Sequence, residues 1–231
     1  MESKTGVMHE YLPFNVTIAR DVETLRAAVQ VRQSAYARHL PDVARTMVDA
    51  ESWDYAPGTV VLVARSKLDG SPLGTMRVHS NEFAPLPLEQ SFPLPEDFVG
   101  LRLVEATRFA IAAGSSPVVK LALFKAFNLY SLALGADRMV IGARAPIDRM
   151  YERLLFKDVG ETGVFVPMAH VGGLPHRVLW QDAKNGQKIL EAARHPLCHF
   201  LFELDHPDII VAGKANPSTA PQPEQLVTDQ A

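Results

Sequence analysis

The stretch LVEATRFAIAAG, residues 103–114, decides the fold. Its apolar residues predict a buried strand, yet it also carries a glutamate, a threonine and an arginine. Side chains alternate along a strand, so Glu105, Thr107 and Phe109 are expected on one face of the sheet. Arg108 is then expected on the other face. Because charged side chains are costly to bury without partners or a chemical role, we expect this strand to carry part of a functional site.

A helix and a second strand are predicted directly after this stretch. Ser116 is a good N-cap, Pro117 suits the first helical position, and Gly135 marks the end of the helix. Residues 137–143 (DRMVIGA) predict a second buried strand, and a strand, helix and strand of this length form a crossover unit with parallel strands. The helix begins beside the end of a strand, so Ser115 and Ser116 are candidates to bind a phosphate, although plain helix capping would also explain them and both can be true.

Further elements are expected on both sides of this unit. Asp21 can cap a helix that Pro41 ends, and Asp69-Gly70 marks a hairpin turn. The proline-rich residues 82–100 contain three phenylalanines and are expected to fold back over an apolar surface. The expected strands are 13–19, 59–65, 73–80, 163–168 and 177–181, and the expected helices are 22–40, 146–156 and 184–194.

Composition excludes several classes of protein. The 231 residues are 47% hydrophobic and 21% charged, which is ordinary for a globular domain. The net charge of −3 and the lack of a basic stripe argue against a nucleic-acid partner. A single cysteine, no apolar run of ~18 residues and no signal pattern lead us to expect a cytoplasmic protein without a transmembrane segment. The pattern His195-x-x-Cys198-His199 lacks a second ligand pair, so we expect no metal.

The order of these elements resembles the GNAT acyltransferase fold. The resemblance implies an α/β (α+β) protein with a central mixed, mostly antiparallel sheet, one parallel splayed strand pair, and flanking helices. Tyr151 to Phe156 is similar to the Tyr-x-x-x-Gly-Phe sequence of that fold's late helix, with Leu155 in place of the glycine. The usual glycine-rich loop that wraps the pyrophosphate of coenzyme A is replaced by RFAIAAG at 108–114. This difference favours a donor with one phosphate, such as phosphopantetheine on a carrier protein.

A narrower resemblance is to the acyl-homoserine-lactone (autoinducer) synthases. It rests on five motifs in the same order: Arg32 with Tyr36; Asp49, Glu51 and Asp54; Gly74 with Arg77; the Phe92–Leu94 run; and Glu105, Arg108 and Phe109. A tryptophan usual after the first motif is absent, and the chain continues past residue 183. These departures are more similar to the related N-acyl amino acid synthases.

The resemblance implies a function and a domain organisation. The donor would be an acyl carrier protein bearing a long-chain acyl-phosphopantetheine, or acyl-CoA, with no permanently bound cofactor, and the acceptor would be an amino acid. Residues 13–183 would form the acyltransferase domain, preceded by a flexible stretch at 1–12. Residues 184–212 would be a helical extension packed on that domain, and the proline-containing 213–231 a disordered tail.

Amide formation from a thioester needs a neutral amine, a polarised carbonyl and a protonated leaving thiol. Glu105 is the candidate base, although a structural Glu105–Arg108 pair would also explain it. His79 is an alternative base or a structural histidine. A bulge between Glu105 and Arg108 would bring both to one site and free backbone amides for the thioester oxygen, and we predict that bulge. Tyr151 is either the acid that protonates the sulfur or a core aromatic.

Substrate contacts are expected from the remaining motif residues. Arg77 or Arg32 is suited to clamp the carboxylate of the acceptor, although Arg32 could instead be a snorkelling side chain. The strands at 103–111 and 137–143 should splay, with an apolar tunnel behind them. The other candidate contacts are Tyr36, Asp49, Asp54, Ser115, Ser116 and, for the tunnel, Phe83, Phe92, Phe109, Phe124, Met139 and Ile141.

Three other functions stay open at this point. A lactone synthase would require S-adenosylmethionine, and a coenzyme A-dependent acetyltransferase would bind acetyl-CoA alone. A non-catalytic acyl- or carrier-binding module would bind the donor without forming a product.

Overall fold

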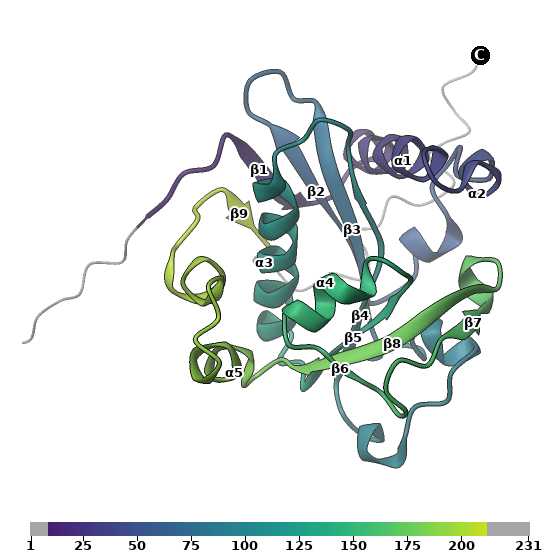
Figure 1. Ribbon diagram of the computed structural model, residues 1–231. Coiled ribbons are helices and arrows are strands. Elements are labelled where there is room, and N and C mark those ends of the chain that lie inside the picture. The colour runs from purple at the N-terminus through teal and green to yellow at the C-terminus, as the bar shows by residue number, and fades with distance from the viewer. Residues whose placement is uncertain (1–8, 212–231) are drawn as a thin grey trace, which may run out of the picture.

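The computed structural model describes residues 9–211 as a mixed sheet flanked by helices (Figure 1). The strands are β1 Phe14–Ile18, β2 Thr59–Ser66, β3 Pro72–Ser80, β4 Leu103–Ile111, β5 Arg138–Ala143, β6 Lys157–Asp158, β7 Val166–Met168, β8 Leu174–Asp182 and β9 Ile209–Ile210. They lie in the order β6-β8-β5-β4-β3-β2-β1-β9, with β7 paired to β8. The β4–β5 and β1–β9 pairs are parallel and the others antiparallel, which confirms the expected fold class.

Helices cover both faces of this sheet. They are α1 Val22–Ala37, α2 Pro41–Arg45, α3 Pro117–Ala133, α4 Asp148–Arg153 and α5 Gly186–Ala192. Leu25 of α1 packs on Val61 and Val63 of β2, whereas α3 shares a core cluster with Leu62 of the same strand. Since side chains alternate along β2, α1 and α3 lie on opposite faces, as Figure 1 also shows. None of the helices within residues 9–211 is long and apolar enough to cross a membrane.

The β4–β5 pair opens into a wedge. Its register runs from Leu103↔Arg138 to Ala106↔Ile141 and stops there, although both strands continue. The predicted splay of these two strands is therefore confirmed. Beyond Ala106, the edge of β4 that faces β5 has no strand partner among residues 9–211.

The predicted bulge in β4 is confirmed, and it lies at Arg108 itself. Thr107 pairs with Arg77 and Ala110 with Thr75, so β4 has one extra residue opposite β3, and Arg108 has a φ of +52°. The extra residue turns Arg108 to the α1 face, which Glu105 and Thr107 share. The expectation that Phe109 joins that face is wrong for the same reason, because Phe109 packs instead with the core on the α3 side.

The proline-rich loop covers a second, smaller core. Leu86, Leu88 and Phe98 are buried there against Val140 of β5 and Val178 of β8, as expected for a loop folded over an apolar surface. Of the three phenylalanines, Phe98 is the buried one, whereas Phe83 is 52% exposed.

Some boundaries differ from the expectation. The first helix ends at Ala37, the helix expected at 146–156 is the single short α4, and β7 is shorter than expected. The chain after residue 183 contains α5, as expected, but it also adds β9, which pairs with β1. The expected tail at 213–231 and most of the expected flexible 1–12 stretch lie outside the described residues, and the domain division stays a prediction.

Candidate active site

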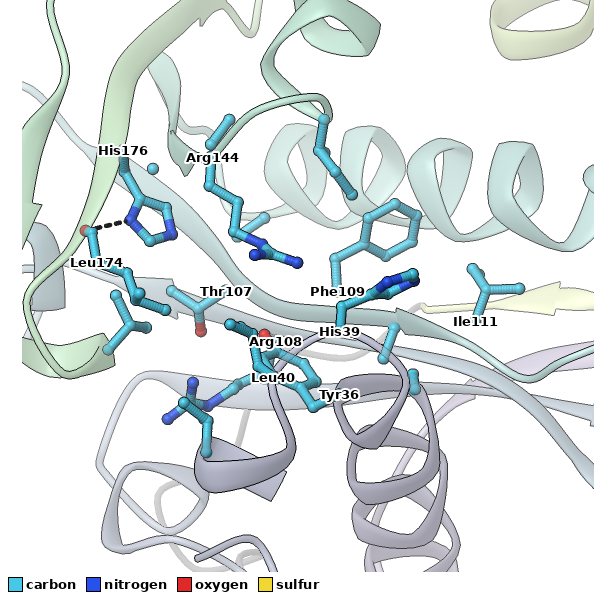
Figure 2. A pocket seen from close by; sticks show the side chains of 18 of the residues that line it. Tyr36, His39, Leu40, Thr107, Arg108, Phe109, Ile111, Arg144, Leu174 and His176 are labelled. Carbon is cyan, nitrogen blue, oxygen red and sulfur yellow. Dashed lines mark hydrogen bonds between the residues drawn. The ribbon is translucent and has the colours of Figure 1, made fainter. Parts of the chain in front are cut away.

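A pocket of about 430 Å³ occupies the wedge between β4 and β5 (Figure 2). Its walls come from the second half of β4, the end of β5, the end of α1 with the turn after it, α4 and residues 170–176. Tyr36, Arg108, Phe109 and Tyr151 line it, all of them predicted site residues. Phe124, Met139 and Ile141 were expected to line a tunnel, but they are buried in the main core and are not among the lining residues.

Three arginines and two carboxylates form a buried cluster on the α1 face of the sheet. Arg32 donates from Nη1 to both oxygens of Asp54, at 2.8 Å each. Arg77 donates from Nη1 to Glu51 Oε2 at 2.9 Å and to Asp54 Oδ1 at 3.3 Å. Arg108 binds Glu51 with two N–H groups, Nε at 2.7 Å and Nη2 at 2.5 Å. Glu51 therefore connects the bulge of β4 to the arginine of β3.

Electrostatics keep Glu51 ionised. Burial opposes its charge, but the hydrogen bond and charge of Arg108, with the charges of Arg77 and Arg32, act more strongly and lower its pKa to about 2. The predicted carboxylate clamp by Arg32 or Arg77 is not supported, because neither lines the pocket and both already bind carboxylates. The snorkelling reading of Arg32 is wrong too, since only 2% of this residue is exposed.

Four predicted contact residues lie away from the pocket wall. Asp54 is buried against Arg32, and Asp49 is exposed. The Ser115 hydroxyl donates to the carbonyl of Leu73 at 3.1 Å, and the Ser116 hydroxyl caps α3. The structural reading of these two serines is thus the one that their contacts support.

His79 is held as a neutral acceptor. Its Nε2 lies 3.1 Å from Arg77 Nε, which can only donate, and 3.0 Å from the Thr107 hydroxyl. Its Nδ1 therefore carries the proton and faces the Thr59 hydroxyl at 2.9 Å. Burial, with the charge of Arg77 next, lowers the pKa of His79 to about 2. These contacts favour the structural reading of His79 over its reading as a base.

Glu105 is fully buried beside the pocket rather than in its wall. Its Oε2 accepts a hydrogen bond from the backbone N–H of Leu88 at 3.0 Å, and its Oε1 has no hydrogen-bond partner within the described chain. Burial raises its pKa to about 8, against the opposing effects of the Leu88 N–H and of Arg77. The alternative Glu105–Arg108 pair is wrong, since Arg108 binds Glu51 instead.

The contacts of Tyr151 support its reading as a core aromatic, whereas its reading as the acid stays a prediction. Its ring packs at 6.2 Å from that of Phe124 and 5.5 Å from that of Phe156, and the residue also lines the pocket. Burial raises its pKa, so the phenol keeps its proton. Arg177 anchors the helix that carries it, by donating to Glu152 at 2.7 Å.

Sequence reasoning did not single out several residues of this site. Glu51 was named only as the middle acid of the Asp49–Asp54 motif and not as a candidate site residue. His170, Arg144 and His176 also line the pocket, and Figure 2 shows Arg144 reaching from the end of β5 toward its middle. No local pattern marks these three, because only the fold brings them beside β4.

Cys198 belongs to a different cluster from the one considered in the sequence. Its sulfur lies with carboxylates of Glu191 and Glu203, all within 4.8 Å of one another, away from the pocket. His195 instead contacts the carbonyl of Arg153 at 2.8 Å. Two of the three possible ligands are exposed, and no further side chain in residues 9–211 completes a site.

Comparison with protein families matches more than half of the chain to a known family. The family model described as "N-acyl amino acid synthase FeeM" matches residues 27–169, which is more than half of the chain and includes all the predicted motifs. A search of curated protein sequences gave no match.

Solved structures share the fold at low sequence identity. FeeM, an N-acyl amino acid synthase from uncultured soil microbes, has a TM-score of 0.60 at 16% identity, over 81% of this chain and 96% of that one. BjaI, a CoA-dependent acyl-homoserine lactone synthase solved with SAM and isopentyl-CoA, has a TM-score of 0.55 at 14% identity, over 84% and 93%. An acyl-CoA N-acyltransferase from Pseudomonas aeruginosa has a TM-score of 0.50 at 18% identity, over 73% and 97%.

Proposed function

The chain belongs to the N-acyl amino acid synthase FeeM family, and on that basis we propose that it joins a long-chain acyl group to the amine of an amino acid. The acyl group would come from the phosphopantetheine thioester of an acyl carrier protein. The observation that carries this proposal is the pocket in the β4–β5 wedge.

The open edge of β4 suits a pantetheine arm. Beyond Ala106, the backbone groups of β4 that face β5 lack a strand partner in the described part of the chain. Pantetheine is an extended chain with two amides, and such a chain can pair with a free strand edge as an added strand would. Its thioester would then lie beside Arg108 and Phe109, where the bulge releases backbone amides toward the carbonyl oxygen.

Cationic side chains around the pocket support a phosphate-bearing donor. Arg38, Lys120 and Arg144 line it, and none of them forms an ion pair with another described residue. They could balance one phosphate. The stretch at 108–114 lacks the glycines that would wrap a pyrophosphate, which favours phosphopantetheine over coenzyme A.

The acyl chain and the acceptor need different surroundings. Leu40, Val43, Ile147 and Met150 provide apolar pocket walls, and burying a twelve-carbon tail at ~0.8 kcal/mol per methylene would contribute roughly 9 kcal/mol before ordering costs. Arg108 lines the same pocket, and its Nη1 has no hydrogen-bond partner among residues 9–211. We assign the acceptor carboxylate to that N–H group.

The proposed reaction releases two protons from the acceptor nitrogen. Glu105 takes the first, which turns the ammonium group into a nucleophilic amine. The amine attacks the thioester carbon, the C–N bond forms, and the oxyanion is stabilised by backbone amides at the bulge. The C–S bond then breaks, Tyr151 protonates the thiolate, and the second nitrogen proton restores the phenol. The first proton leaves Glu105 for solvent.

Product analysis tests this function. Purified protein would be incubated with acyl carrier proteins bearing chains of 2 to 16 carbons and a pool of amino acids, then searched by mass spectrometry for N-acyl products. We expect products from long-chain donors, without S-adenosylmethionine, and at higher kcat/KM than with the matching acyl-CoA. A product that requires S-adenosylmethionine, or transfer from acetyl-CoA alone, would replace this proposal with a lactone synthase or an acetyltransferase.

A further inference from the structure

The proposed base has no direct route to the substrate. Glu105 is 0% exposed and is not among the residues that line the pocket. One of its oxygens accepts the Leu88 N–H, and the other, Oε1, has no partner within residues 9–211. A proton from the acceptor amine must therefore cross another group before it reaches this carboxylate.

His170 lies between Glu105 and the pocket. Its Nε2 is 4.0 Å from Glu105 Oε1, and the residue lines the pocket. Only 6% of its side chain is exposed, and its Nδ1 is buried without a partner in the described chain. A distance of 4.0 Å is too long for a hydrogen bond, but a small ring rotation or one water closes it. Catalytic hydrogen bonds are often this loose before substrate binds.

The proline-rich loop at residues 82–100 contacts both Glu105 and the short segment that carries His170. His170 belongs to a short 3-10 helix, Ala169–Val171, whose first N–H donates to the Ser91 hydroxyl at 2.7 Å. Leu88 of the same loop donates to Glu105. Because one loop contacts both groups, their separation is set by the fold rather than by chance contact of two mobile side chains.

We propose that His170 is a further catalytic residue, which relays the proton of the acceptor ammonium from the pocket to Glu105. The inference rests on the proposed function, and it adds to that function the path of the first proton. His170 would accept the proton at Nδ1 as Nε2–H passes its own proton to Glu105 Oε1. The ring ends neutral in its other tautomer, the amine is neutral and Glu105 is protonated. The imidazole regains its starting tautomer when Glu105 returns its proton to solvent through it.

The charges around His170 suit a relay that starts neutral. Burial, followed by the electrostatic effects of Arg108, His176 and Arg77, lowers the pKa of His170 to about 4, against the opposing charge of Glu51. Its ring is therefore neutral at the pH of the assay. A neutral imidazole carries one donor and one acceptor nitrogen, which is the arrangement that a relay needs.

The test compares two acceptors in His170→Asn. With an amino acid, whose amine is protonated near neutral pH, we expect kcat to fall ~10²-fold while KM changes little. With methoxyamine, whose nitrogen is already neutral, we expect a loss of less than about threefold, since no ammonium proton has to be removed. Equal loss with both acceptors would contradict the relay and indicate that His170 only supports the pocket.

A double variant separates the relay from a structural role. If His170 and Glu105 act as one unit, adding His170→Asn to Glu105→Gln should lower kcat by less than about threefold more, because effects within a unit are not additive. Full multiplication of the two losses would overturn the proposal. His199→Asn is the matched control, because His199 pairs with Glu203 at 2.7 Å on the surface, and it should keep wild-type kinetics.

Failure of the relay is distinguishable from failure of the proposed function. A wild-type enzyme that makes no N-acyl amino acid from any donor rejects the function itself. An active wild type with an equally active His170→Asn rejects the relay alone. Equal melting temperatures of wild type and variant would show that any loss is not one of folding.

Discussion

The side chains that matter most in this protein are those whose charge the fold has changed or fixed. Burial raises the pKa of Glu105 to about 8, so this carboxyl is protonated below that pH, whereas Glu51, which binds Arg77 and Arg108, stays ionised. Burial dominates the environment of Glu105, whereas three arginines dominate that of Glu51. Glu51 is therefore suited to hold arginines in place, and Glu105 to the proton transfer that we propose for it.

The pH dependence of turnover should report Glu105. Its pKa is raised above the ordinary 4.5 to about 8, so the base form is scarce at pH 6 and abundant at pH 9. We expect kcat/KM to rise about tenfold per pH unit below pH 8 and to level off above it. A rate series from pH 6 to 9.5 with an amino acid acceptor measures this. A flat profile would remove Glu105 as the base.

Replacing Glu51 should lower the free energy of unfolding. Glu51→Gln would leave Arg77 and Arg108 without their shared carboxylate, and removal of one partner from a buried ion pair typically costs 3–5 kcal/mol. Since 26% of this side chain is exposed, we expect about 2–3 kcal/mol in urea unfolding at pH 7.

The pH dependence of the stability difference between wild type and Glu51→Gln provides the control. The folded-state pKa of Glu51 lies below its ordinary 4.5, so the stabilisation is present above pH 4.5 and is lost as the pH falls toward 2. The stability difference between wild type and Glu51→Gln should therefore shrink in acid. A difference that grows with acidity would show that the cluster is not ionised as described.

Sequence reasoning reached some of these residues and not others. Glu105, Arg108 and Tyr151 were found because a charge in a buried strand, or a phenol in a late helix motif, is visible locally. The pairing of Arg108 with Glu51 rather than Glu105 was missed, since it depends on the bulge turning Arg108 and on a loop 57 residues earlier. His170 was missed because nothing near it in the chain indicates Glu105.

At the scale of elements, the wedge forms because β4 pairs with β5 along only half of its length. Its first half pairs with β5, and its second half pairs with no strand on that side within the described residues, while β3 pairs with it throughout apart from the bulge. The crossover through α3 was predictable from caps and periodicity. The short β6 was not, because two residues carry no period, whereas β7 was predicted over the longer range 163–168.

Gly74 tests how tightly α3 is set against β3. A Cβ at this position would lie 2.9 Å from Ile111 Cδ1 and 2.9 Å from Leu123 Cδ1. We expect Gly74→Ala to lower the free energy of unfolding by about 1–3 kcal/mol, as overpacking does. Gly186→Ala is the control, since its closest neighbour would lie at 3.5 Å, and it should be neutral or slightly stabilising. Equal tolerance of both changes would mean that α3 does not pack as closely as described.

For the whole molecule, the C-terminal segment is part of the fold rather than an appendage. Leu201 and Ile209 belong to the main core, and Lys125 of α3 donates to the carbonyl of Phe200 at 2.8 Å and to His206 Nδ1 at 3.0 Å. The sequence predicted a helical extension here, but it gave no sign of β9, whose two residues pair with the edge of β1.

Truncation measures how much residues 195–211 contribute to the stability of the fold. A chain that ends at residue 194 loses these core residues and the partners of Lys125, so we expect it to be insoluble or to melt at least 10 °C lower, a shift of about 3 kcal/mol or more for a domain of this size. A chain that ends at residue 211 keeps every described contact and serves as the control. Unchanged melting of the shorter chain would make residues 195–211 dispensable.

The central claim is that the β4–β5 wedge receives the thioester, and a crystal structure with a stable analogue tests it most directly. The analogue would be dodecyl-phosphopantetheine with a thioether in place of the thioester. We predict its sulfur between β4 near residues 107–109 and the end of β5, with its amides along the open edge of β4 and its tail among Leu40, Val43 and Met150. An analogue bound elsewhere, with the wedge closed or empty, would contradict the claim.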